Sequence, residues 1–352
     1  MNIIECEKTV NPNSDMLTYN GRIDFSETQA PIFVFPGSSV TMLFYGSILK
    51  VFIKNNHHYY DNYIGYIMDG VEGRVLLLND DKLQEIILGE ELQEDKLHEI
   101  TLFKRQDGCH EFTFYGFIIS KDGSVVIPRK KPKLCIEFYG ETAAAGELVE
   151  AGEYNTQMKY NGESSNVWHS YAMITAKNLK AQVSIIAQSG IAFKDNCGYF
   201  LAPNCIGMES IYDKLHFNPN LGQVSCWNFK EYIPQVVVID LGQNDAVPED
   251  FMKNDRNGTK AAKWKSRYKE FVLNIREKYP NAYIILTTNV IKHHQSWDRA
   301  IGAVCRQISD EKIVHFLYSN NGRAVPCYVN SQWSEQMAFE LSLFIKKLIS
   351  NT

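Results

Sequence analysis

The chain has 352 residues, which is longer than one ordinary domain and favours two. Apolar residues make up 45% of it, enough for two hydrophobic cores. The net charge of −5, with both signs mixed, argues against a nucleic-acid or anionic-membrane partner, which would require a basic face. No apolar run is long enough to span a bilayer, and residues 1–10 are polar and acidic, so no signal peptide is visible.

The eight cysteines are scattered and contain no C-x-x-C pair, so the sequence indicates no metal site made of thiolates. We interpret them as small buried residues. Cys197 and Cys205 lie in one loop-like region and are near enough along the chain to pair in an oxidising compartment. Spacing alone leaves that pairing open.

Residues 1–130 carry a β pattern. Apolar residues alternate with polar ones in the ranges 40–53, 99–102 and 112–114, and turn-forming residues separate the runs. Many short strands at this spacing predict a β-sandwich of the jelly-roll kind. The polar, proline-bounded stretch 128–132 reads as a linker, so we expect one domain over 1–130 and a second over 131–352.

After the linker, apolar strands alternate with helices. We expect strands over 134–139, 183–187, 236–241, 283–286 and 313–317, and helices over 165–178, 264–275 and 337–348. Strands that are apolar on both faces and separated by helices predict a parallel sheet in a three-layer α/β/α arrangement. Ligands of such sheets bind beyond the carboxyl ends of the strands, where loops begin here at Gly140, Gln188 and Gly242.

Three short segments in these loops resemble the motifs of the SGNH (GDSL-type) hydrolases. They are Ile136–Thr142, Ser189–Gly190 and Gly242–Asp245, in the family's order. The strands in front, within 62–70 and 97–119, are similar to a jelly-roll accessory domain. With these motifs and this accessory domain, the chain resembles carbohydrate esterase family 2. That resemblance implies an SGNH-hydrolase domain that removes acetyl groups from polysaccharide by acyl transfer and hydrolysis, an acetylated oligo- or polysaccharide as partner, no metal, no cofactor, and an exported or extracellular protein.

The same resemblance places two departures at the catalytic positions. Thr142 stands at the nucleophile position in place of serine, and its extra methyl group restricts the rotation that an attacking hydroxyl needs. Tyr328 stands at the base position in place of histidine, and an unperturbed tyrosine, with a pKa of about 10, is a poor proton acceptor at neutral pH. Pro326 occupies the place of the acidic partner. Catalysis is therefore expected to be impaired.

The oxyanion hole is expected to be intact. The resemblance assigns it the backbone N–H groups of Thr142 and Gly190 and the side-chain amide of Asn244. Glu141, which replaces the family's aspartate, is expected to order the turn. Two hypotheses remain open: an impaired acetyl esterase, or a non-catalytic relative that binds polysaccharide or serves as a scaffold.

Four other side chains have two interpretations each. Trp227 and Trp297 either stack on sugar rings or pack in the core. His293 and His294 follow a strand in a loop that can reach the same crevice, although a solvated loop pair is favoured. His169 is expected to pack within the 165–178 helix.

Overall fold

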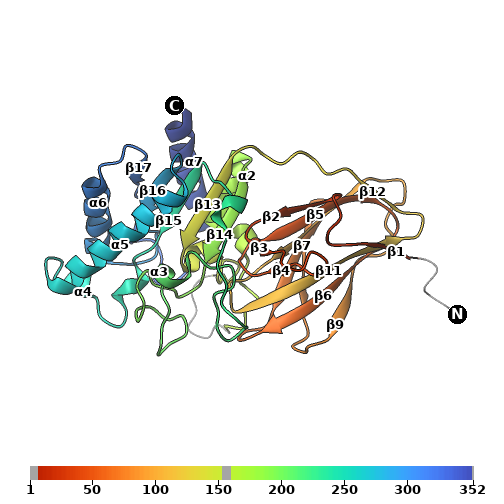
Figure 1. Ribbon diagram of the computed structural model, residues 1–352, viewed down its shortest axis with the longest axis horizontal. Helices are drawn as coiled ribbons and strands as arrows, with labels where there is room; N and C mark the ends of the chain where they lie inside the picture. The colour runs from red at the N-terminus through yellow and green to blue at the C-terminus, as the bar shows by residue number, and fades with distance from the viewer. Residues whose placement is uncertain (1–6, 153–159, 351–352) are drawn as a thin grey trace.

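The computed structural model describes residues 7–152 and 160–350. Two antiparallel sheets come first along the chain, and a parallel sheet covered by helices follows. Figure 1 shows the antiparallel sheets at one end of an elongated molecule and the parallel sheet with its helices at the other. This arrangement confirms the expected fold class, a β-sandwich followed by a three-layer α/β/α unit.

Each antiparallel sheet has six strands. The first has the order β3-β4-β11-β6-β9, with β1 paired to β11; its strands are β1 Glu7–Val10, β3 Ile23–Asp24, β4 Ile32–Phe33, β6 Leu49–His57, β9 Leu83–Gly89 and β11 His110–Ser120. The second has the order β12-β5-β10-β7-β8, with β2 paired to β5; its strands are β2 Leu17–Asn20, β5 Ser39–Tyr45, β7 Tyr63–Met68, β8 Val71–Leu76, β10 His98–Lys104 and β12 Ser124–Val126.

The core of the sandwich follows from the period of two in its strands. Along β6, Leu49, Val51 and Ile53 are fully buried, whereas the residues between them are partly exposed. They pack with inward residues of both sheets, among them Phe112 and Leu102. Each strand therefore contributes alternate side chains to one shared core.

The parallel sheet has five strands in the order β14-β13-β15-β16-β17. Its strands are β13 Cys135–Gly140, β14 Gln182–Ala187, β15 Val236–Asp240, β16 Tyr283–Thr287 and β17 Ile313–His315. The helices are α1 Thr142–Ala145, α2 Tyr171–Leu179, α3 Met208–Ile211, α4 Phe251–Asn254, α5 Thr259–Lys278, α6 Ser296–Ile308 and α7 Ser331–Ser350. Short 3-10 turns are η2 Val167–His169, η3 Phe229–Glu231 and η4 Asn244–Ala246.

Helices cover both faces of this sheet. On one face, Phe138 packs with residues of α2 and α7, such as Tyr171 and Leu341. On the other face, Tyr139 packs with Trp264 of α5 and with residues of α6. The sheet is therefore buried on both sides, as the uninterrupted apolar runs predict.

The structure divides one predicted helix and shortens the last predicted strand. The helix expected over 165–178 is divided at Ser170, whose side chain caps α2 by accepting from the N–H of Met173 at 3.3 Å. A serine at that position offers the backbone a cap instead of a continuing turn, so η2 precedes α2 as a separate element. The strand expected over 313–317 ends at His315.

The predicted linker lies along the molecular surface between β12 and β13 (Figure 1). Lys131 Nζ donates to the carbonyl of Tyr19 at 2.6 Å, and Gln182 Nε2 donates to the carbonyl of Pro132 at 2.7 Å. These contacts hold it against both halves. The division at 130/131 remains a prediction.

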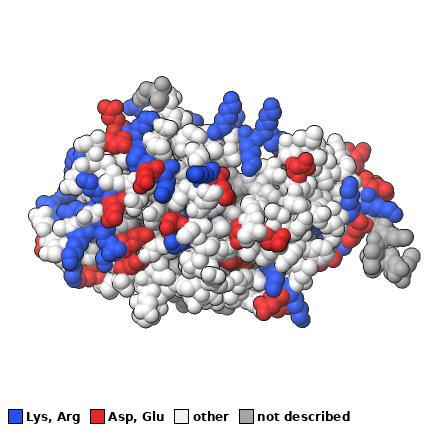
Figure 2. Space-filling view, in the orientation of Figure 1, with Lys and Arg blue, Asp and Glu red and all other residues white. Residues whose placement is uncertain are grey.

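Charges on the surface are mixed. On the face that Figure 2 shows, Lys and Arg side chains are interspersed with Asp and Glu over the helical half instead of gathering in one patch. Within residues 7–152 and 160–350, the helices include none that is both long and apolar enough to cross a membrane.

Candidate active site

A crevice of about 1080 Å³ lies at the carboxyl ends of the parallel strands. It is lined by the loops that follow β13, β14, β15, β16 and β17, together with residues 58–60 of the sandwich. The structure places Thr142, Gly190, Asn244 and Tyr328 around this one crevice. The residues singled out from the sequence therefore meet in space, while their catalytic roles remain predictions.

Thr142 lies at the start of α1 and is 8% exposed. Its Oγ1 accepts the backbone N–H of Gly190 at 3.1 Å. Gly190 has a φ of +70°, in the left-handed region that favours glycine, so the tight turn after β14 depends on this residue type. The expected nucleophile and one expected oxyanion donor are thus bonded to each other.

Glu141 connects the loops after β13 and β15. It is fully buried and accepts the backbone N–H groups of Gly242 at 2.8 Å and Asn244 at 3.3 Å. Burial raises the pKa of Glu141 well above its ordinary value, and Asp245 and Asp240 nearby add to the rise. These bonds give Glu141 the ordering position that the sequence suggested for it.

The side chain of Asn244 is also held by a hydrogen bond. Its Nδ2 donates to the carbonyl of Ile191 at 2.9 Å, so one of its two amide hydrogens is already engaged. The neighbouring Asp245 is buried and accepts from Phe193 N, Lys194 N and Trp264 Nε1 at 2.7–3.0 Å. Asp245 therefore fixes the loops after β14 and β15 to each other and to α5.

Tyr328 lines the crevice but is 5% exposed, and it packs with Leu148 and Ala151. Its hydroxyl donates to the carbonyl of Gly152 at 3.3 Å. The side chain therefore closes one wall of the crevice.

Ser189 and Glu147 also line the crevice, and the sequence analysis gave neither a role. Ser189 Oγ donates to Glu147 Oε2 and lies 3.4 Å from Thr142 Oγ1. Burial raises the pKa of Glu147 to about 7; the charge of Asp107 adds to the rise, and the bond from Ser189 offsets part of it. Ser189 precedes the recognised Gly190, but only the fold brings Glu147 to it.

The sandwich helps to shape this site through the loop between β10 and β11. Asp107 Oδ2 accepts from Gln188 Nε2 at 2.7 Å and from the backbone N–H of Ser189 at 3.0 Å. The buried Lys104 ammonium donates to the carbonyls of Gln106 and Asp107, which holds the loop in place. A side chain from the first half of the chain thus positions Ser189 in the second.

The histidine pair of the loop after β16 is not in the crevice wall. The His293 side chain is buried, with Nε2 2.9 Å from Asp298 Oδ1, and His294 Nδ1 lies 2.9 Å from Ser296 Oγ. Their neighbours Ile291 and Lys292 line the crevice instead. Among the histidines of the described chain, His58 alone lines it.

Both tryptophans that were considered for sugar stacking are core residues. Trp297 is fully buried and packs edge-on against Trp264, with ring centroids 5.3 Å apart. Trp227 is 8% exposed and lies under the Arg22 guanidinium. The Phe and Tyr residues at the crevice are Tyr59, Tyr60, Tyr160, Tyr199, Phe200 and Tyr328. Cys197 and Cys205, whose pairing the sequence left open, are both free thiols.

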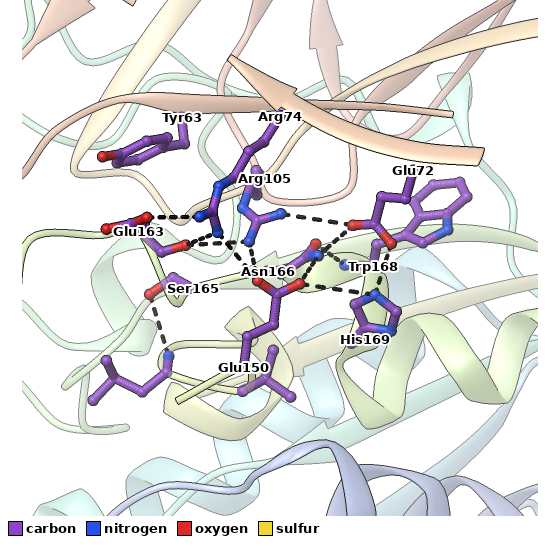
Figure 3. Close-up of polar contacts among 12 residues, drawn as sticks. Tyr63, Glu72, Arg74, Arg105, Glu150, Glu163, Ser165, Asn166, Trp168 and His169 are labelled. Carbon is purple, nitrogen blue, oxygen red and sulfur yellow. Dashed lines mark hydrogen bonds and ion pairs between the residues drawn. The ribbon is translucent and has the colours of Figure 1, made fainter. Parts of the chain in front are cut away.

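His169 has a partner that the sequence did not reveal. Its Nε2 lies 2.7 Å from Glu72 Oε2 of β8, and its side chain is 40% exposed, so it does not pack within a helix (Figure 3). Asn166 Nδ2 donates to both Glu72 and Glu150, and Arg105 pairs with Glu150. Three potential ligand groups meet here, from Glu72, Glu150 and His169. Arg105 already balances these carboxylates, and the absence of a metal site remains a prediction.

Comparisons with known proteins find similarity to carbohydrate esterases. Residues 19–128 match the family model described as the carbohydrate esterase 2 N-terminal domain. The cellulase/esterase CelE of Acetivibrio thermocellus is 31% identical over 281 residues, which cover 80% of this chain and 32% of that protein. This chain thus spans about a third of the length of CelE. An acetylxylan esterase / glucomannan deacetylase of Cellvibrio japonicus is 23% identical over 276 residues, which cover 77% of this chain and 70% of that protein.

Similarity to solved structures extends over both halves of the chain. A family two carbohydrate esterase from Clostridium thermocellum, solved in complex with cellohexaose, is 26% identical with a TM-score of 0.79. The match covers 95% of this chain and 99% of that one. The chain is therefore similar over nearly its whole length to a family two carbohydrate esterase, and residues 19–128 match the model of the carbohydrate esterase 2 N-terminal domain.

Proposed function

We propose that the chain binds acetylated oligo- or polysaccharide in the crevice and removes acetyl groups there. The route in which Thr142 is the nucleophile and Tyr328 the base (the Thr142–Tyr328 route) is impaired. The observation that carries this proposal is the meeting of Thr142, Gly190, Asn244 and Tyr328 around one crevice. The names of the relatives, an esterase and a deacetylase, and a neighbour's complex with cellohexaose support the substrate class.

The crevice suits a neutral sugar polymer. Tyr199 is 60% exposed and Tyr160 is 49% exposed at its wall, and their flat apolar faces match those of pyranose rings. Asn204 and Asn220 add amide groups for sugar hydroxyls. The mixed surface charge favours such a partner over a nucleic acid. Acyl transfer to a hydroxyl and hydrolysis require neither metal nor cofactor.

Two contacts support impairment of the Thr142–Tyr328 route. Thr142 Oγ1 accepts from Gly190 N–H, so the hydroxyl occupies a donor that the oxyanion would need. Tyr328 keeps its proton in a bond to the carbonyl of Gly152, and a neutral phenol oxygen is a weak proton acceptor. Pro326 supplies no acidic partner to orient a base at residue 328.

The same Thr142–Gly190 bond favours a second candidate function, non-catalytic binding of polysaccharide or a scaffold role. In that case the crevice recognises the sugar and releases no acetate. The two candidates share the binding site and differ only in turnover.

Calorimetric titration with cellohexaose and with acetylated xylan, combined with acetate measurement, tests both candidates. We expect binding that Tyr199→Ala weakens and that Phe339→Ala leaves unchanged. Phe339 is a suitable control because it is 58% exposed on α7. Binding with slow acetate release supports the esterase, whereas binding without release supports the second candidate. Absence of binding to both polymers would contradict the two together.

A further inference from the structure

A serine hydroxyl and a carboxyl group form a bonded pair in the wall of the crevice. Ser189 Oγ donates to Glu147 Oε2, and both residues face the same space as Thr142. The Thr142–Tyr328 route uses neither of them. A hydroxyl bonded to a carboxylate is the arrangement by which a general base activates a nucleophile.

Both members of the pair are held in place by bonds that do not depend on a ligand. The backbone N–H of Ser189 donates to Asp107 Oδ2 at 3.0 Å. Glu147 follows Gly146, the left-handed cap of α1, and its N–H donates to the carbonyl of Thr142 at 3.3 Å. Pre-positioned groups of this kind are what a reacting site requires.

We propose that Ser189 is the nucleophile and Glu147 the general base for ester cleavage in this crevice. This inference rests on the proposed function, because it concerns the same crevice and the same class of ester. It names the residues that supply turnover where Thr142 and Tyr328 depart from the family pattern.

The reaction balances with these two groups and water. Glu147 takes the Ser189 proton as Oγ forms a bond to the acetyl carbon, and the carbonyl electrons move to the oxygen. The bond to the sugar oxygen then breaks, and that oxygen takes the proton from Glu147 and leaves as a hydroxyl. Water attacks the acetyl-serine, giving its proton to Glu147. Ser189 Oγ departs from the carbon, recovers that proton, and acetic acid is released.

The neighbouring groups suit this chemistry. The backbone N–H of the next residue, Gly190, donates to Thr142 Oγ1 at 3.1 Å. This N–H becomes available to an oxyanion if the Thr142 side chain rotates away. Burial raises the pKa of Glu147 to about 7, so the carboxylate is a stronger base than an ordinary glutamate. Other titratable groups around it are Asp107, Tyr59, Tyr60, Cys109 and Cys327.

The experiment compares the full chain with Ser189→Ala and Glu147→Gln, using 4-nitrophenyl acetate and a fluorophosphonate probe. Ser210→Ala is the matched control, because Ser210 Oγ also donates to a carboxylate, Asp195 Oδ2 at 2.6 Å, away from the crevice. Peptide mapping by mass spectrometry locates the adduct. We expect it on Ser189, with turnover lost in Ser189→Ala and reduced roughly 100- to 10,000-fold in Glu147→Gln.

Turnover should also rise with pH through about 7 as Glu147 ionises. An adduct on Thr142, turnover that survives Ser189→Ala, or an unmodified chain that neither turns over nor is labelled would each overturn the pair. If turnover were lost in His58→Ala but not in Glu147→Gln, the general base would be His58 instead. Cellohexaose binding by the unmodified chain separates the outcomes. A chain that binds the sugar but is not labelled contradicts the pair alone, and a chain that is labelled on Ser189 but does not bind the sugar contradicts the proposed function alone.

Discussion

The acidic side chains of Glu147, which lines the crevice, and of Asp107 lie near each other. Burial raises the pKa of Glu147 to about 7, and the charge of Asp107 contributes to this rise. An acid whose pKa is higher in the folded state than in the unfolded state disfavours folding once it ionises. The crevice therefore holds a carboxylate whose charged form is destabilised at a place where a base is useful, and this lowers the stability of the fold.

Glu147→Gln is expected to stabilise the protein at alkaline pH. The penalty from Glu147 is absent below its ordinary pKa of 4.5, grows as the pH rises, and is complete above about 7. At about 1.4 kcal/mol per pKa unit, this penalty is at most about 3 kcal/mol. It is smaller than that limit because part of the side chain reaches solvent. Thermal unfolding at pH 5 and pH 8 measures it: the gain in Tm should be larger at pH 8. An equal gain at both values would contradict the raised pKa.

Restoring the family's two catalytic residues is expected to act cooperatively. Thr142→Ser removes the methyl group but leaves no base at residue 328, and Tyr328→His leaves the threonine, so each change alone should gain little. The double variant should gain more than the product of the single gains, because nucleophile and base work as one unit. Full recovery is not expected with Pro326 in place. Turnover of 4-nitrophenyl acetate by all four proteins measures this, and gains that simply multiply would contradict it.

At the scale of elements, the loop between β10 and β11 couples the sandwich to the crevice. Asp107 in this loop accepts from Gln188, Ser189 and its own neighbour Cys109, so three donors depend on one carboxylate. The N–H of Gly108 also donates to Gln188 Oε1 at 3.0 Å. The turn after β14 therefore takes its shape from a different half of the molecule.

Asp107→Ala is expected to destabilise the chain and to disorder the serine. An unsatisfied buried donor costs about 1–3 kcal/mol, partly offset here because the charge next to Glu147 disappears. We expect a net loss of about 2 kcal/mol in urea unfolding, and weaker fluorophosphonate labelling of Ser189 in the folded protein. Asp107→Asn keeps one acceptor oxygen and should lie between the two. Undiminished labelling in Asp107→Ala would show that the loop does not position Ser189.

Periodicity and strand ends were enough to predict the parallel strands, the longest helices and the place of the crevice. The spacing of Trp264, Tyr268 and Phe271 corresponds to the buried face of α5, and the residues after β13, β14 and β15 meet as parallel topology requires. Contacts between distant residues could not be predicted. Asp107 and Ser189 are 82 positions apart, and no local pattern signals their bond. Composition likewise could not distinguish the buried Trp297 from a sugar-binding residue.

At the scale of the whole molecule, buried charges join the sandwich to the parallel sheet. Arg22 lies 3.4 Å from Glu137 of β13, and both side chains are fully buried. Arg22 also donates to the carbonyls of Tyr212 and Lys214 at 2.9 and 2.7 Å. Such pairs add specificity to an interface because a shifted arrangement would leave a charge unpaired.

His216 makes this junction depend on pH. It lies in the loop after α3, with Nδ1 3.0 Å from Glu111 Oε1 of β11 and Nε2 2.9 Å from Asp24 Oδ2 of β3. Burial alone would lower its pKa, but the bonds and charges of Glu111 and Asp24 outweigh burial and raise the pKa to about 9. The imidazolium therefore bridges two carboxylates of the sandwich at neutral pH.

His216→Gln is expected to destabilise the protein most at pH 6 and least at pH 10. The contribution of a histidine whose pKa is raised on folding is fully present below its unfolded value of 6.5 and is lost as the pH rises through about 9. The difference in Tm between the variant and the unmodified chain should therefore shrink across that window. Because Glu147 is present in both proteins, its own loss of stability with rising pH cancels in the difference. In an Asp24→Asn, Glu111→Gln background, His216→Gln should change Tm little at any of these pH values. A constant difference from pH 6 to pH 10 would mean that the neutral ring holds the junction equally well through packing alone.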